Sequence, residues 1–297
     1  MEVIIIGSSS SCPTKIRNQS SIAVKHNEQT FIFDAGDGTQ RELLFNNISN
    51  ITKIFITHMH GDHVFGLPGL LCSLCSKENS NTLEIYGPKG LKKYIDNIIE
   101  NTFSIIKRKY IVYEIINYEN EDISTHASTD VTQICANLEQ VDLNQPLHWI
   151  VFEDDNIKVL AARLEHTILC YGYVLIEKTA TESQKNGRKI VILGDTCDSN
   201  DMMYIGQNAD ILIHEATHAN FTKNANKEQL DLKAVKYGHS TPEMAGKFAQ
   251  SINAKKMILT HFSPFFKDKD FIKIRNLAKE YFNGMVIISC DGLKISI

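Results

Sequence analysis

The chain of 297 residues is 43% hydrophobic and 22% charged, a balance that suits a folded protein with a large core and excludes a disordered one. Its formal net charge of −4 argues against a protein that coats nucleic acid through bulk positive charge. The acidic start Met1-Glu2 and the lack of a long apolar run predict a cytoplasmic protein without a signal peptide or a membrane span.

Short runs rich in β-branched residues, each ending in glycine or in polar residues, predict the strands. In the first half of the chain these runs cover residues 3–6, 21–24, 30–33, 54–57 and 83–86. Apolar residues at helical spacing predict helices over 67–75 and 91–99. The region 107–155 gives a weaker pattern, in which a strand-like run at 110–116 is followed by a polar stretch at 117–130.

The second half repeats this pattern, with strands predicted at 148–152, 159–162, 171–176, 190–193, 211–213, 257–259 and 286–289, and a polar loop at 178–188. The segment Ser240-Thr241-Pro242-Glu243 combines a capping hydroxyl, a proline for the first turn and a capping-box glutamate, so a helix is expected to run to about Ile252. Strand-rich halves with helices between them predict an α/β fold of two packed sheets covered by helices, an αββα sandwich forming one domain over residues 1–297.

The sharpest chemical signal is a cluster of three histidines and one aspartate directly after the strand predicted at 54–57. Within six residues the chain places His58, His60, Asp62 and His63. Neutral imidazoles and carboxylates in a loop at a strand end suit zinc, with manganese and iron as plausible alternatives. We therefore interpret this loop as part of a metal site.

Four later segments extend the cluster, because most of their polar residues also follow strand-like runs. They are Leu164-Glu165-His166-Thr167, Leu193-Gly194-Asp195-Thr196, Ile213-His214-Glu215-Ala216-Thr217 and Leu259-Thr260-His261-Phe262-Ser263-Pro264. Earlier in the chain, Asp34 has two interpretations: its carboxylate caps the turn at 36–38, or it hydrogen-bonds a metal-binding histidine. We favour the second.

Together with Gly238-His239-Ser240-Thr241, these motifs resemble the ribonuclease Z family, the tRNA 3′-processing endonucleases of the metallo-β-lactamase superfamily. The resemblance runs almost from end to end. It includes Pro13-Thr14-Lys15, Arg17-Asn18-Gln19-Ser20-Ser21, the segment 33–40, Gly66-Leu67-Pro68-Gly69-Leu70-Leu71 and Tyr86-Gly87-Pro88-Lys89-Gly90.

The resemblance implies a metallo-β-lactamase sandwich that holds two zinc ions per chain. One ion would be held by His58, His60 and His166 and the other by Asp62, His63 and His261, while Asp195 bridges both. Two ions about 3.5–4 Å apart can lower the pKa of a shared water and clamp the oxygens of a phosphodiester.

The resemblance also implies the proton transfers of the reaction. Asp62 would accept the proton of the attacking water, which the metal pair activates as hydroxide. His239 is similar to the general acid of the family, and Glu215 would orient and charge it, because a nearby carboxylate favours an imidazolium. Glu215 must then outweigh the helix N-terminus that follows His239.

One departure concerns the substrate. Bacterial members usually carry a long glycine- and proline-rich arm that grips the elbow of tRNA, between the later metal histidine and the Gly-Asp-Thr motif. Here only 28 residues separate His166 from Asp195. Basic residues at 89–93 and 107–109 could replace the arm, although exposed lysines on a helix usually only solvate it.

Two enzymatic hypotheses follow, and the first leads. The chain is a tRNA 3′-processing endonuclease that binds pre-tRNA in another way, or a phosphodiesterase that acts on small esters such as cyclic nucleotides or nucleotide fragments. A non-catalytic scaffold is disfavoured, because all seven ligands are present. The family resemblance suggests a homodimer, and the sequence assigns no residue to substrate binding.

Overall fold

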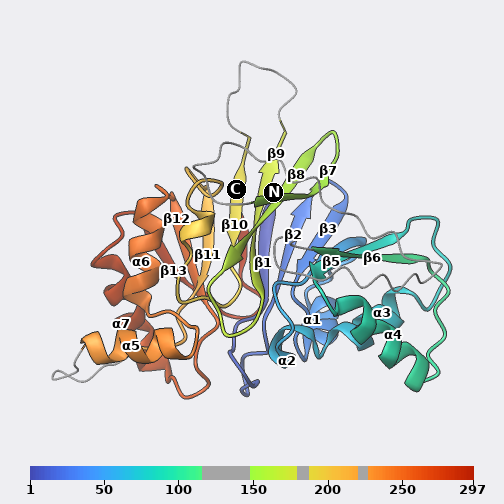
Figure 1. Ribbon diagram of the computed structural model, residues 1–297, viewed down its shortest axis with the longest axis horizontal. Coiled ribbons are helices and arrows are strands. Elements are labelled where there is room, and N and C mark those ends of the chain that lie inside the picture. Colours follow the sequence, from blue (N-terminus) through green and yellow to red (C-terminus); the bar gives the residue numbers. More distant parts are fainter. Residues whose placement is uncertain (116–147, 179–186, 220–226) are drawn as a thin grey trace, which may run out of the picture.

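Two mixed β-sheets lie face to face in the computed structural model, which describes residues 1–115, 148–178, 187–219 and 227–297 (Figure 1). The first sheet has the strand order β14-β1-β2-β3-β4-β5-β6, and the second has the order β13-β12-β11-β10-β9-β8-β7. The strands of the first sheet are β1 (Glu2–Gly7), β2 (Ser21–His26), β3 (Gln29–Phe33), β4 (Ile51–Phe55), β5 (Leu83–Pro88), β6 (Tyr110–Ile115) and β14 (Lys294–Ser296). Those of the second are β7 (His148–Glu153), β8 (Ile157–Leu164), β9 (Cys170–Glu177), β10 (Lys189–Ile192), β11 (Ile211–Glu215), β12 (Lys256–Thr260) and β13 (Met285–Ile288).

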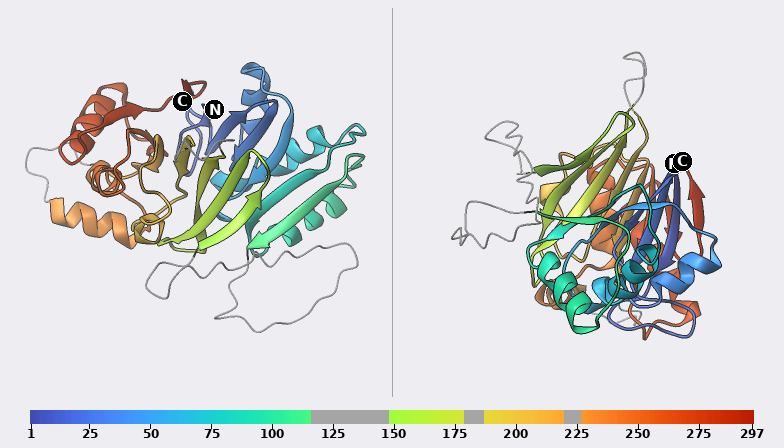
Figure 2. Two further views of the ribbon diagram at one scale, coloured as in Figure 1. Left: turned by 90° about the horizontal axis from the view of Figure 1, so that it is seen from above. Right: turned by 90° about the vertical axis from the view of Figure 1, so that its right-hand side faces the viewer.

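Helices cover the outer faces of both sheets (Figure 2). One buried cluster joins the first sheet to α1, α3 and α4, and another joins the second sheet to α6 and α7. This arrangement confirms the predicted αββα sandwich. The helices are α1 (Thr39–Phe45), α2 (Gly61–Val64), α3 (Leu67–Leu74), α4 (Leu91–Asn101), α5 (Lys227–Lys236), α6 (Pro242–Ser251) and α7 (Asp268–Lys279), with a 3-10 turn, η2 (Asn200–Met202).

Aromatic side chains fill the space between the two sheets. Phe55 of β4 stacks on Phe33 of β3 and on Tyr86 of β5, with ring centroids 4.9 Å apart in both pairs. Across the interface, the hydroxyl of Tyr173 on β9 donates to the carbonyl of Ile56 at 2.7 Å. The inter-sheet core therefore fixes the distance between β4, which leads into the histidine cluster, and the second sheet.

The directions of the strands bring several predicted site residues to one edge of the second sheet. β10, β11 and β12 are parallel, and β9 is antiparallel to both β8 and β10, so β8 runs in the same direction as β10. The carboxyl ends of these four strands therefore meet at one edge of the second sheet. The segments that contain His166, Asp195, Glu215 and His261 lie at this edge.

The predicted elements differ from the structure mainly at their ends. The strand expected at 54–57 spans Ile51–Phe55 instead, so Thr57 already lies in the loop. Thr241 caps α6 by accepting a hydrogen bond from the Met244 amide at 3.3 Å, which places Glu243 at the second helical position and rules out the expected capping box. Helices α1, α5 and α7 were not predicted. The polar stretch at 117–130 and most of the loop at 178–188 lie outside the described residues.

The termini lie side by side. β14 pairs with β1, and the Ile297 amide donates to the Met1 carbonyl at 3.1 Å. Among the helices described, none combines the length and the apolar character that crossing a bilayer requires.

Candidate metal centre

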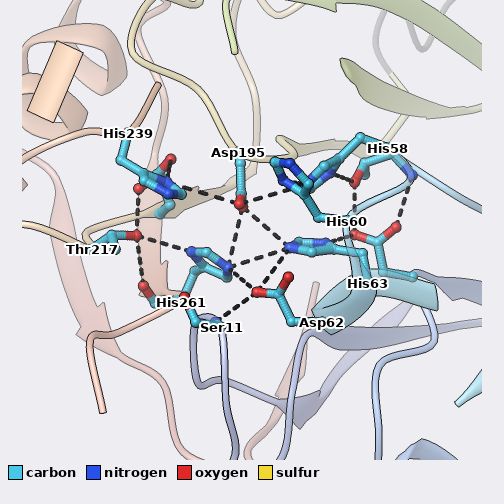
Figure 3. A network of polar contacts seen from close by, with 12 residues as sticks. Ser11, His58, His60, Asp62, His63, Asp195, Thr217, His239 and His261 are labelled. Atoms are coloured by element: carbon cyan, nitrogen blue, oxygen red, sulfur yellow. Dashed lines mark hydrogen bonds and ion pairs between the residues drawn. The ribbon is translucent and has the colours of Figure 1, made fainter. Parts of the chain in front are cut away.

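The seven predicted ligands converge on one site at the edge of the two sheets (Figure 3). The loop after β4 and the short helix α2 bring His58, His60, Asp62 and His63, and the segments after β8, β10 and β12 bring His166, Asp195 and His261. Their potential ligand atoms form two groups that share Asp195, and within each group these atoms lie within 4.8 Å of one another.

The first group contains three histidines and Asp195. Nδ1 of His60 lies 3.1 Å from Nε2 of His58 and 3.1 Å from Nε2 of His166. Oδ2 of Asp195 lies 3.6 Å from His58 and 4.0 Å from His166. Ligands about 2.0–2.1 Å from a tetrahedral zinc ion are roughly 3.3–3.4 Å from one another, so these separations fit one ion between the four side chains.

The second group contains Asp62, His63, His261 and the other oxygen of Asp195. Nε2 of His261 lies 3.3 Å from Nε2 of His63, from Oδ2 of Asp62 and from Oδ1 of Asp195. Nε2 of His63 lies 3.4 Å from the same Asp195 oxygen. Asp195 therefore directs one oxygen to each group, which is the geometry that a bridging carboxylate requires.

Hydrogen bonds on the outer ring nitrogens orient the imidazoles. Nδ1 of His63 lies 2.7 Å from Oδ2 of Asp34, and Nδ1 of His58 lies 2.9 Å from the hydroxyl of Thr57. Nδ1 of His166 donates to the Gly238 carbonyl at 2.6 Å. With the outer nitrogen held in this way, Nε2 faces the centre, and such contacts typically tune both orientation and metal affinity.

Asp34 contacts the metal centre, and another side chain accepts a hydrogen bond from the neighbouring turn. Besides His63, it accepts hydrogen bonds from the amide and hydroxyl of Thr57 at 2.7 and 2.9 Å. In the turn, the Asp37 amide donates to the side chain of Gln19. The geometry thus agrees with the favoured interpretation of Asp34 as the partner of a ligand histidine.

The electrostatics of the site also fit a cation. Burial lowers the pKa of His58 well below its ordinary value and lowers that of His166, which leaves these imidazoles neutral and able to donate a lone pair. Burial also opposes a charge on His63, yet the carboxylates of Asp195 and Asp34 raise its pKa well above the ordinary value. This excess of negative charge around a buried nitrogen is what a metal ion would offset.

His239 lies beside the centre and is paired with Glu215. Its Nδ1 lies 3.1 Å from Oε1 of Glu215 and 3.8 Å from Oδ2 of Asp195. Burial lowers the pKa of His239, but the charge of Glu215, the hydrogen bond to it and the charge of Asp195 outweigh burial and raise the pKa to about 9. Glu215 therefore favours the charged form of His239.

Three contacts of the site were missed by sequence reasoning. The hydroxyl of Thr217 donates to Oε2 of Glu215 at 2.5 Å and lies 2.9 Å from Nδ1 of His261, so it links the acid pair to a ligand. The Ser11 amide donates to Oδ2 of Asp62 at 2.6 Å. Gly238 has a φ of 71°, and a Cβ there would lie 2.6 Å from Nδ1 of His166. Only Thr217 and Gly238 belonged to a recognised motif, and no local pattern marks Ser11.

Two of the basic residues considered as a substitute for the arm have partners within the fold. Arg108 is buried, and its guanidinium donates to the carbonyls of Asn81 and Ile51. Lys92 pairs with Asp96 one turn along α4. Arg108 and Lys92 therefore serve the fold.

Comparison with known proteins decides the family. A model described as a β-lactamase superfamily domain matches residues 29–262. Ribonuclease Z of Prochlorococcus marinus (strain MIT 9312) is 32% identical over 94% of this chain and 94% of its own length. Ribonuclease Z of Bacillus cereus (strain AH187) is 32% identical over 97% of this chain and 96% of its own length.

The chain belongs to the ribonuclease Z family of the metallo-β-lactamase superfamily. The crystal structure of the short form of human tRNase Z matches 100% of this chain and 99% of its own, with a TM-score of 0.77 and 33% identity. The chain is therefore a metal-dependent hydrolase. Its seven histidine and aspartate side chains lie where one metal centre can form.

Within this ribonuclease Z fold, the connection between the later histidine and Asp195 is short. β9 and β10 pair along their length, from Lys189 opposite Ile176 to Ile192 opposite Tyr173. The Glu177 amide then donates to the Arg188 carbonyl at 2.9 Å, so the two strands stay paired up to the loop. The short connection between His166 and Asp195, which the sequence predicts, is therefore a feature of the second sheet.

Proposed function

We propose that this protein is a two-metal phosphodiesterase that cleaves the 3′ trailer from pre-tRNA. The observation that carries the proposal is the pair of ligand groups sharing Asp195, with the His239–Glu215 pair beside them. The RNA substrate is supported by relatives named ribonuclease Z that align over almost the whole chain, and by the likeness to human tRNase Z.

The residues present fit two divalent ions, and we propose zinc, with manganese or iron as alternatives. His58, His60 and His166 would hold one ion, Asp62, His63 and His261 the other, and Asp195 both. When bound, such a pair polarises the phosphodiester and lowers the pKa of water, so that an attacking hydroxide is available near neutral pH.

The proton transfers fall to two side chains on opposite parts of the centre. Burial opposes a charge on Asp62, but the neighbouring imidazoles of His261 and His63 outweigh burial and lower its pKa, so this carboxylate is ionised. We assign it as the acceptor of the proton of the attacking water. Its orientation is set by the Ser11 amide. As the water oxygen bonds to phosphorus, the bond from phosphorus to the 3′-oxygen breaks.

His239 supplies the proton that the leaving 3′-oxygen requires. The raised pKa keeps its imidazole charged at neutral pH, and Glu215, which also accepts from the Thr196 amide at 2.8 Å, holds the ring in place. The products are an RNA that ends in a 3′-hydroxyl and a trailer that begins with a 5′-phosphate.

A second candidate is hydrolysis of a small diester, which the short connection between β9 and β10 favours. The test compares a pre-tRNA carrying a 3′ trailer with bis(p-nitrophenyl) phosphate and cyclic nucleotides under one set of conditions. We expect kcat/KM for pre-tRNA to exceed the values for the small esters by orders of magnitude. Similar kcat/KM values for all three substrates would contradict the nuclease and favour the small-ester phosphodiesterase.

We further propose that the protein works in the cytoplasm as a homodimer, as the family resemblance suggests. Light scattering on the purified protein should give about twice the mass of one chain. A monomer that cleaves pre-tRNA at full rate would contradict the dimer without affecting the assignment of the metal centre.

A further inference from the structure

Two aromatic side chains extend the site outward from His239. The ring of His218 lies 5.7 Å from the ring of His239, and the ring of Tyr237 stacks on His218 with a centroid distance of 6.1 Å and an interplanar angle of 29°. His239 in turn lies 5.2 Å from His166 and 5.6 Å from His261. A continuous row of rings therefore leads from the metal ligands to the surface.

The backbone holds the outer pair firmly against the site. The His218 amide donates to the Ser240 carbonyl at 3.2 Å, so His218 is tied to the segment that contains His239. Tyr237 follows α5 and precedes Gly238, whose carbonyl accepts from the ligand His166. Tyr237 is nevertheless 50% exposed. A large ring is thus held in a fixed place with one part open to solvent.

These rings lie on the His239 side of the metal centre, and this position determines which part of the RNA they can contact. His239 delivers its proton to the 3′-oxygen that leaves, and that oxygen belongs to the nucleotide upstream of the scissile phosphate. The upstream ribose and its base must therefore lie next to His239. A base in that position is within reach of the next rings of the row, His218 and Tyr237.

We propose that Tyr237 and His218 form a stacking platform for the base of the nucleotide whose 3′-oxygen leaves, which makes them substrate-binding residues. This inference rests on the proposed function, since a small diester without an upstream base would not use the platform. Stacking suits this role because every base has an aromatic face, and proteins commonly bind unpaired RNA in this way.

The local charge agrees with a nucleic acid ligand. Burial, the charge of His239 and the charge of Lys233 lower the pKa of His218. Its ring is therefore neutral at neutral pH. Lys233 and Lys236 are both exposed on α5, the helix that ends beside Tyr237.

The experiment combines protein variants with abasic RNA. On a pre-tRNA, Tyr237→Ala should reduce kcat/KM by about 5- to 150-fold, the range that loss of one base stack gives, whereas Tyr237→Phe should keep near-normal activity. Both variants should bind as much metal as the unmodified protein. The matched control is Tyr204→Ala, which removes a tyrosine that is 46% exposed and also lies beside a histidine, His148 of β7.

The decisive measurement uses a pre-tRNA without the base upstream of the cleavage point. The unmodified protein should lose as much activity on this RNA as Tyr237→Ala loses on the intact one, and the variant should lose nothing further. An abasic site just downstream should leave the activity of each protein as it is on the intact RNA. Additive losses would overturn the platform, as would no loss at all.

If the proposed function is wrong, these experiments give a different result. In that case the unmodified protein hydrolyses bis(p-nitrophenyl) phosphate but does not cleave pre-tRNA efficiently. If the unmodified protein cleaves pre-tRNA and Tyr237→Ala behaves like Tyr204→Ala, the nuclease stands and the platform is wrong.

Discussion

Several of the predicted ligands have a second partner, and these partners divide the proposed site into an acid half and a base half. Glu215 accepts from His239 and, through the Thr217 hydroxyl, contacts the ligand His261. Asp62 receives the Ser11 amide on the same oxygen that faces His261. The acid and the base are therefore positioned by different segments, so single substitutions should separate metal binding from proton transfer.

His239→Ala tests the acid half. The variant should keep its metal, because His239 belongs to neither of the groups that share Asp195, but it should cleave RNA about 10²–10⁴-fold more slowly, the usual range for lost general acid catalysis. The loss should shrink on bis(p-nitrophenyl) phosphate, whose leaving group departs without a proton. Single-turnover rates on both substrates measure the effect, and equal losses would remove His239 from the acid role.

Asp195→Ala tests the bridge. Because its two oxygens face different ligand groups, the variant should bind fewer than two ions per chain and lose hydrolysis by several orders of magnitude. Metal analysis of the purified variant beside the unmodified protein, which we expect to hold close to two ions, checks the result. Full occupancy with a near-normal rate would contradict the bridging assignment.

At the scale of elements, ion pairs lock the strands far from the metal centre. Glu177 at the end of β9 accepts from the guanidinium of Arg188, with Nε 2.6 Å from Oε2, and lies 3.3 Å from Nε2 of His26 on β2. Arg188 also donates to the Ile297 carbonyl at 2.9 Å. One carboxylate thus joins both sheets and the C-terminus.

This cluster should make the stability of the fold depend on pH in the acid range. The hydrogen bond from Arg188, opposed by burial, lowers the pKa of Glu177 to about 2 from its ordinary value of 4.5. A depressed folded-state pKa means that the stabilisation is complete above about pH 4.5 and is lost as the pH falls towards 2. Glu177→Gln should therefore cost about 1 kcal/mol at neutral pH, a value discounted for solvent screening, and nothing near pH 2.

Thermal or urea unfolding between pH 2 and 7 measures the difference between the two proteins. The curves should converge as the pH falls. A constant difference across that range would mean that the substitution acts through packing and that the ionised pair contributes little.

At the scale of the whole molecule, positive charge is unevenly distributed. Residues 227–297 contain 12 Lys and Arg against 7 Asp and Glu, although acidic residues outnumber basic ones in the full chain, 35 to 31. These residues include α5, α6 and α7, which lie together at one side of the molecule (Figure 1). Any phosphate contacts that replace the arm should therefore come mainly from this side.

Binding through such contacts should be sensitive to salt. Counterion release predicts that affinity for pre-tRNA falls about 10³-fold or more between roughly 50 and 200 mM salt if six or more phosphates are neutralised. A small diester makes one or two contacts and should barely respond. The ratio of kcat/KM for the two substrates, measured across this range, should fall as salt rises, and a ratio that stays constant would exclude a binding surface of this kind.

The sequence by itself determined the fold class and the set of histidine and aspartate residues that meet at the site. Alternation of apolar runs and turns specified most strands, because side-chain burial follows local periodicity. His58, His60, Asp62 and His63 were recognisable because all four lie within one loop. The short connection between His166 and Asp195 was equally visible, since it is a matter of chain length.

The tertiary structure decided what depends on contacts between distant segments. Only the packing of strands side by side in the first sheet sets Asp34 against His63 and Ser11 against Asp62, 29 and 51 residues apart. The same packing buries Arg108, which the sequence places in a basic run. Local spacing carries no information about such pairs, because it is the sheet order and the inter-sheet core that bring these segments together.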